Sequence, residues 1–250
     1  MPREHKIHYC QIACRLPGWG LRGRTKKMAE KEGLLPAHGG YRRLKSFQVA
    51  QLIYDATARF CDSFIDRRSR THDQMVQAAR SGVQNIAEGS VASGTSKKSE
   101  LKLTNVARAS LEELRLDYED FLRQRGLPIW PPSHPALLRF KGRRCSSMAE
   151  LLDWEKEELE EEKKGRTRTD TDEQRQGGAP AWSLPGRESP CLSVLSASKA
   201  LLQANALLSL LNLCCWLLDR QIVAQAAAFE KEGGFTERLY RVRSQRRNKP

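Results

Sequence analysis

The sequence predicts an all-α protein, an up-and-down four-helix bundle with a disordered N-terminal arm and an irregular insertion before the last helix. Three segments between residues 44 and 125 carry apolar residues at every third or fourth position, the period of an amphipathic helix. A fourth segment, 200–218, contains no charged residue. Alternating apolar and polar runs and Asn-Gly turns are missing from these segments, so no sheet is expected.

The first two helices are expected at Leu44–Phe64 and from Thr71 to about Gly89. Thr71 and Gln74 have the spacing of a capping box, in which each residue's side chain bonds the other's backbone N–H group. The inner face of the second helix carries small residues, which would let a neighbouring helix approach closely.

The third helix is expected from Lys97 to Arg125, because Gly126 and the prolines after it end the helical pattern. The last helix is expected to start at Pro190, with Ser189 as its cap, and to end at Glu232.

The charge-free centre of the last helix is long enough to span a membrane. A membrane span is not favoured, because Asn205, Ser209 and Asn212 form a polar stripe along it. Such a stripe is typical of a central bundle helix with one less buried line.

The chain divides by composition into five parts. Residues 1–40 are a disordered N-terminal segment or an over-extended start of the reading frame, and residues 41–130 contain the first three helices. Residues 131–190 are an insertion or linker with a short acidic helix from Met148. Residues 191–232 form the last helix, and residues 233–250 are a basic suffix.

The net charge is +13, and the excess lies at the two ends of the chain. Residues 1–27 carry seven basic side chains and one acid, and residues 238–250 carry six basic side chains and no acid. Basic segments attract nucleic acid and other anionic surfaces without regard to sequence. A solvated tail without a ligand is the alternative interpretation.

The seven cysteines are an odd number with irregular spacing, which predicts reduced thiols and a cytoplasmic protein. The polar first residues do not resemble a signal peptide. Four potential metal ligands near the start fit no common zinc module, so neither a metal nor a cofactor is predicted; they are His5, His8, Cys10 and Cys14.

Catalytic motifs are not found: there is no phosphate-binding Gly-x-x-x-x-Gly-Lys loop and no His-Glu-x-x-His helix. Glu88 is the best candidate for a catalytic carboxylate, but no paired acid has matching spacing. We therefore expect a non-enzymatic protein in which Asn85, Glu88 and Gly89 form a structural motif, with Asn85 and Glu88 holding a turn or a helix–helix contact by hydrogen bonds. A hydrolase or nuclease that uses Glu88 remains the catalytic alternative.

Four runs in segment 41–130 are together specific: Gln77-Ala-Ala-Arg80, Gln84-Asn-Ile-Ala-Glu-Gly89, Ser96-Lys-Lys-Ser-Glu100 and Asn105-Val-Ala-Arg-Ala-Ser-Leu-Glu-Glu-Leu114. With them the chain resembles the bacterial 23S rRNA intervening-sequence four-helix-bundle family. The C-terminal run from Glu232 to Arg241 looks like the suffix found in a subgroup of that family.

The resemblance implies a small helical bundle that assembles with copies of itself, often as a ring. Related accessory proteins of diversity-generating retroelements are similar bundles that bind nucleic acid and a reverse transcriptase. Nucleic acid and a nucleic-acid-processing protein are therefore the partners that the resemblance implies. The chain departs from the family in residues 1–27 and 133–190.

Basic side chains at the start of the third helix, within the second helix and in the C-terminal arm are the candidates for phosphate contacts, and Tyr240 is a candidate for stacking on a base. The candidate nucleic-acid-binding residues are Arg80, Lys97, Lys98, Lys102, Arg238, Tyr240, Arg241, Arg243, Arg246 and Arg247. The expected function is a non-enzymatic oligomeric module that binds RNA or a DNA–RNA structure. The alternative is a protein-interaction scaffold that binds no nucleic acid.

Overall fold

The computed structural model describes residues 38–173 and 194–247. All of them belong to one compact unit, which begins at Ala37. Most of the expected N-terminal arm lies outside the described residues, and so do the four potential metal ligands and the expected cap and start of the last helix.

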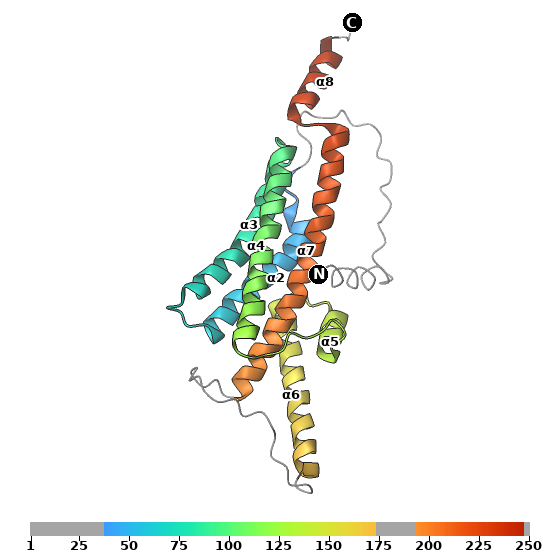
Figure 1. Ribbon diagram of the computed structural model, residues 1–250. Coiled ribbons are helices and arrows are strands. Elements are labelled where there is room, and N and C mark those ends of the chain that lie inside the picture. The colour runs from blue at the N-terminus through green and yellow to red at the C-terminus, as the bar shows by residue number, and fades with distance from the viewer. Residues whose placement is uncertain (1–37, 174–193, 248–250) are drawn as a thin grey trace, which may run out of the picture. The chain divides into compact units, whose positions relative to one another are not determined.

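Every regular element in the described part of the chain is a helix, which confirms the all-α prediction (Figure 1). The helices are η1 (Tyr41–Arg43), α2 (Lys45–Phe64), α3 (Arg70–Ala92), α4 (Lys97–Gln124), α5 (Pro135–Arg143), α6 (Met148–Glu173), α7 (Val194–Glu232) and α8 (Phe235–Arg247).

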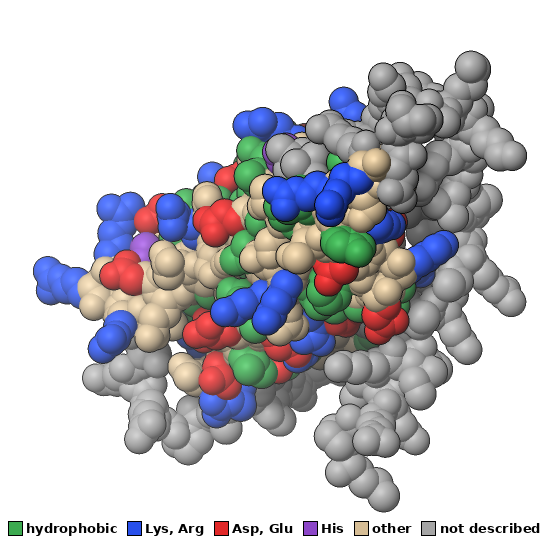
Figure 2. All heavy atoms as spheres, turned by 90° about the horizontal axis from the view of Figure 1, so that it is seen from above, with side chains coloured by type: hydrophobic (Ala, Val, Ile, Leu, Met, Phe, Trp, Pro, Cys, Tyr) green, Lys and Arg blue, Asp and Glu red, His purple; other side chains and the backbone are tan. Residues whose placement is uncertain are grey.

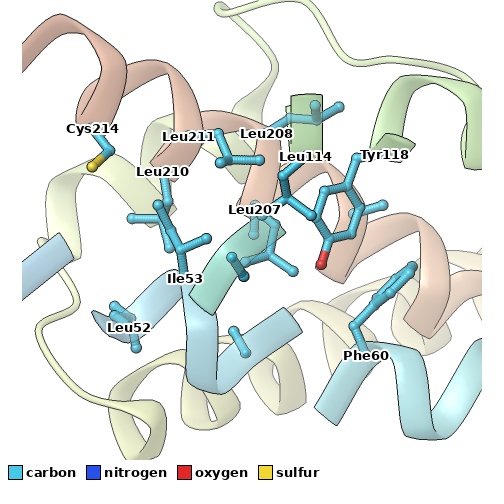
Figure 3. Packing of buried hydrophobic residues seen from close by; sticks show 14 of the residues in the cluster. Leu52, Ile53, Phe60, Leu114, Tyr118, Leu207, Leu208, Leu210, Leu211 and Cys214 are labelled. Atoms are coloured by element: carbon cyan, nitrogen blue, oxygen red, sulfur yellow. The ribbon is translucent and has the colours of Figure 1, made fainter. Parts of the chain in front are cut away.

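Four of these helices pack along one another and are called the helical core below: α2, α3, α4 and α7. Their apolar stripes meet in one cluster, in which the ring of Phe60 contacts the ring of Tyr118 edge-on at a centroid distance of 5.0 Å (Figure 3). The Tyr118 hydroxyl is buried and donates a hydrogen bond to Thr57 Oγ1 at 3.1 Å, so its burial leaves no unpaired donor.

The close contact between α3 and α4 depends on two buried glycines seven residues apart, Gly82 and Gly89. A Cβ atom at Gly82 would lie 2.6 Å from Leu111 Cδ2, and one at Gly89 would lie 3.3 Å from the Glu100 carbonyl oxygen. The structure therefore places small residues where α4 comes nearest, as the sequence predicts.

The start of α3 differs from the capping-box prediction. Ser69 is the N-cap, and its hydroxyl accepts a hydrogen bond from the Thr71 backbone N–H at 3.3 Å, while Thr71 lies inside the first turn. The helix also continues past Gly89 to Ala92. Gly89 does not end it, because this glycine packs against α4 instead of adopting a positive φ.

Two of the three residues in the polar stripe on α7 are buried, although the sequence suggested a less buried line; the third, Asn212, is half-buried. Asn205 is 2% exposed and Ser209 is 8% exposed. Asn205 accepts a hydrogen bond from the Trp130 backbone N–H at 2.8 Å and donates to the Pro128 carbonyl oxygen at 3.2 Å. It thus fixes the segment that follows α4, a contact invisible in helical spacing alone.

The insertion at 131–190 is more regular than predicted, since its described part contains α5 and a long α6 that pack against the core. Trp154 of α6 is buried against Phe140 of α5, with ring centroids 4.7 Å apart. Two residues of the expected solvated acidic run are also buried: Glu155 accepts a hydrogen bond from Gln203 at 2.8 Å, and Glu158 pairs with Arg139 at 2.5 Å. Partners far away in sequence compensate for the cost of burying these carboxylates.

The stretch Ser196–Gln245 contains a window with mean hydropathy 1.7 that is long and apolar enough to cross a membrane. Of this window, 72% is buried inside the protein, as in the central helix of a helical core.

Candidate nucleic-acid interface

The junction between α7 and α8 is built from two glycines. Gly233 has φ of 71°, a left-handed conformation that favours glycine, and its N–H donates to the Phe229 carbonyl oxygen at 2.9 Å, which closes α7. The N–H of Gly234 donates to Glu237 Oε2 at 2.8 Å, so an acid caps the start of α8. The helix is therefore interrupted here, and α8 begins as a separate helix that extends beyond the end of α7 (Figure 1).

Two of the α8 arginines turn back to the last residue of α7. Arg238 Nη2 lies 3.7 Å from Glu232 Oε2, and its side chain is only 19% exposed. Arg241 Nη2 donates a hydrogen bond to the Glu232 backbone carbonyl, one of the oxygens left unpaired at the end of α7. Both arginines thus help to hold the junction.

Tyr240, Arg243 and Arg247 lie on a different face of α8. Their spacing of i, i+3 and i+7 places them within about 60° around a helix that turns about 100° per residue, away from the side of Arg238 and Arg241. Tyr240 is 74% exposed, and both arginines are exposed. In the described part of the chain no acid pairs with Arg243 or Arg247, so these two cations face solvent. They and Tyr240 are called the outer face of α8 below.

The start of α4 and the start of α8 lie at the same end of the molecule. A small hollow there is lined by Lys97 from α4 and Arg238 from α8, together with Ser93, Gly94, Thr95, Gly233, Gly234 and Phe235. Lys97 is paired within its own helix, with Nζ 3.1 Å from Glu100 Oε2. Glu100 also accepts a hydrogen bond from Gln225 of α7 at 3.2 Å, which ties the two helices together beside the hollow.

The other predicted basic residues have different positions. Lys98 and Lys102 are exposed on the first two turns of α4. Arg80 is exposed on α3 but lies twelve residues before the end of that helix, which at about 1.5 Å per residue is about 18 Å from the hollow. The side chain of Arg246 lies outside the described residues. The structure therefore brings together the α4 and α8 candidates and leaves Arg80 apart.

The face of the molecule at this end is mixed in character. In Figure 2, Lys and Arg side chains alternate with acidic and hydrophobic ones over the described surface instead of forming one continuous patch. A ligand with regularly spaced charges would contact several separate cations here, and a single small anion would meet only one or two.

The motif around Asn85 behaves only partly as the sequence suggested. Asn85 Nδ2 donates to the Ser81 carbonyl oxygen at 2.8 Å and to Ser81 Oγ at 3.1 Å. Ser81 Oγ in turn lies 2.9 Å from Ser110 Oγ of α4, so the amide supports the contact between α3 and α4. Glu88 is exposed and makes no hydrogen bond to another described residue. The hydrogen bond by which Glu88 was expected to hold a turn or a helix–helix contact is therefore not seen among the described residues.

Three of the four described cysteines are buried and are poor nucleophiles. Burial raises the pKa of the Cys61 and Cys215 thiols to about 12, and it raises the pKa of Cys214 as well. The thiolate is the reactive form, so these groups are inert near neutral pH. Within residues 38–173 and 194–247, no group of His, Cys, Asp and Glu is arranged to hold a metal ion.

No protein-family model, curated protein or solved structure matches this chain.

The pairing of Arg238 with Glu232 and the nearness of Lys97 to α8 were not predicted from the sequence. The glycine pair after Glu232 indicated a helix end, but nothing in the sequence indicated which arginines would turn back toward α7. That choice depends on the angle between the two helices.

Proposed function

We propose that this chain is a non-enzymatic helical module that binds nucleic acid, RNA or a DNA–RNA structure, through the outer face of α8 and the start of α4. The observation that carries the proposal is that two basic segments far apart in sequence lie at one end of the molecule, where Arg238 of α8 shares a hollow with Lys97 of α4. Arg243 and Arg247 lie on the other side of the same short helix and have no described acid as a partner. Phosphate contacts by several arginines and lysines supply most of the affinity in sequence-independent binding.

In this proposal the helical core is an up-and-down four-helix bundle that acts as a rigid support for α8. Tyr240 stacks on an unpaired base, while Arg243 and Arg247 contact the phosphates beside it. The family resemblance supports the same function and adds a nucleic-acid-processing protein as a partner. A cytoplasmic location, with no membrane partner, belongs to this proposal too.

The test is a salt titration of oligonucleotide binding by fluorescence anisotropy. The double variant Arg243→Gln, Arg247→Gln should bind more weakly on every sequence, and the slope of log K against log salt should fall by about 0.7–0.9 for each phosphate that the variant no longer binds. The matched control is Arg67→Gln, Arg68→Gln, which removes the same charge from the turn before α3. Equal affinities and equal slopes for the two variants would rule out α8 as the binding surface.

The second candidate function, a protein-interaction scaffold, is supported by exposed apolar side chains outside the core. Leu213 and Val223 are 37% and 69% exposed along α7, and Leu116 is 53% exposed on α4. Surfaces of this kind commonly bind another protein.

We propose a second copy of the chain as the first partner to test, in a ring or a smaller assembly. The uncharged centre of α7 is not available to a second copy, because Leu208 and Leu211 are buried within the single chain. The self-association proposal therefore rests on the exposed side of α7. Sedimentation of the native protein and of Leu213→Glu, Val223→Glu tests it: a monomer in both cases would contradict it.

A further inference from the structure

Glu232, the last residue of α7, is the acid that lies beside two arginines of α8. Its carboxylate lies 3.7 Å from the guanidinium of Arg238, and its backbone carbonyl accepts a hydrogen bond from Arg241. A carboxylate presents the same charge and the same kind of oxygen acceptor as a phosphodiester, and arginine binds both.

Little else holds α8 in place among the described residues. No other described helix makes an extensive contact with α8, and the connection is a pair of glycines, of which Gly233 has a positive φ. The ion pair itself is at the surface, since the Glu232 side chain is 52% exposed. Exposed ion pairs of this kind are weak, so a polyanion can displace the carboxylate.

The other cation of the hollow has a competing partner too. Lys97 faces the hollow with Arg238 but is paired with Glu100, which is itself held by Gln225. On the outer face of α8, in contrast, neither Arg243 nor Arg247 forms an ion pair with a described acid. The α8 arginines thus fall into a free pair, Arg243 and Arg247, and a pair engaged at the junction, Arg238 and Arg241.

We propose that Arg238 and Arg241 form a second phosphate subsite that Glu232 occupies until a nucleic-acid backbone displaces its carboxylate. This inference rests on the proposed function and adds a regulatory feature to it. Nucleic acid first meets the outer face of α8. Release of Arg238 then lets this arginine bind a further phosphate and frees α8 to move about the glycine pair.

The test compares Glu232→Gln with Glu230→Gln in the full-length chain, using a single-stranded oligonucleotide as the probe. Both changes remove one negative charge near the end of α7, but only Glu232 contacts Arg238. Glu232→Gln should bind about two- to fivefold more tightly than Glu230→Gln, since exposed ion pairs are worth little. Its salt slope should be steeper by at most about 0.7–0.9, because in the parent protein the carboxylate competes for this one phosphate contact.

A third variant checks that the gain passes through Arg238. Arg238→Gln should weaken binding by the parent protein and lower its salt slope, because the parent loses the phosphate contact made after Glu232 is displaced, and it should abolish the gain when it is combined with Glu232→Gln. Equal affinities and slopes for Glu232→Gln and Glu230→Gln, in a protein that binds the oligonucleotide, would overturn the subsite and leave the proposed function standing. Absence of binding by the parent and by every variant at low salt would overturn both.

Discussion

The middle of α7 and the whole of α8 are neighbours in sequence but have opposite relations to the rest of the molecule. In α7 the side chains from Leu202 to Leu211 are all buried, and the amides of Gln203 and Asn205 are hydrogen-bonded to other segments. In α8 the described basic side chains face solvent or the end of α7, and no other described helix covers it extensively. The first region is held by packing and the second by a few polar contacts.

Because of this difference, substitutions that affect folding stability and substitutions that affect ligand binding should fall in different helices. Removing a buried apolar side chain costs the transfer free energy and leaves a cavity, whereas changing an exposed side chain costs little. Substitutions in α7 should therefore change the free energy of unfolding, and substitutions on the outer face of α8 should change only the affinity for a ligand. The predictions below test this separation.

The largest effect is expected at Leu211, which is fully buried between helices of the core (Figure 3). Leu211→Ala should lower the free energy of unfolding by about 2–5 kcal/mol, and Leu211→Asp should lower it further because the charge has no partner there. Urea denaturation measures the change. Tyr240→Ala, made beside them, should leave the midpoint unchanged; a similar loss there would mean that α8 is part of the core.

A smaller loss is expected at Gly82, where α3 and α4 approach closely. A methyl group would meet Leu111 at 2.6 Å, so Gly82→Ala should destabilise the protein by about 1–3 kcal/mol. The matched control is Gly142→Ala in α5, since no atom lies within 4 Å of the added methyl group. The control should be neutral or stabilising, because alanine favours a helix. Equal effects would contradict the close contact.

At Tyr240 we expect a loss of similar size in the free energy of binding, with no loss in the free energy of unfolding. Tyr240→Ala should weaken binding to single-stranded oligonucleotides by about 1–3 kcal/mol if the ring stacks on a base, with little change on duplex. Tyr240→Phe should keep most of the affinity, since it keeps the ring. Anisotropy titrations of both variants measure the difference, and equal losses on single strands and duplex would exclude stacking.

The smallest effect on stability near neutral pH is expected from the buried thiols. Folding raises the pKa of Cys61 and Cys215 from 9.0 to about 12, so the folded state holds protons that the unfolded state loses above pH 9. Stability should therefore be constant below about pH 8 and fall progressively as the pH rises from 9 toward 12. Denaturation midpoints measured from about pH 7 to about pH 10.5 check this. In Cys61→Ser, Cys215→Ser the decline should be smaller, and an identical decline would assign it to other groups.

The sequence predicts most of the fold, since apolar spacing locates α2, α3, α4 and α7 to within a few residues. It fails in the insertion, because α5 and the burial of Glu155 depend on Trp154 and Gln203, partners that local spacing cannot identify. The candidate interface is predicted in composition but not in arrangement. Six arginines and lysines near the C-terminus are evident in the sequence, whereas the turn of Arg238 toward Glu232 depends on the geometry at Gly233.

The most direct test of the central claim is hydrogen exchange of the full-length chain with and without a saturating single-stranded oligonucleotide. If α8 and the start of α4 are the binding surface, amide protection should increase in residues 234–247 and 94–102. The middle of α7 should not change, because it is already protected by packing. Unchanged exchange in both segments, or new protection confined to the exposed side of α7, would contradict the account.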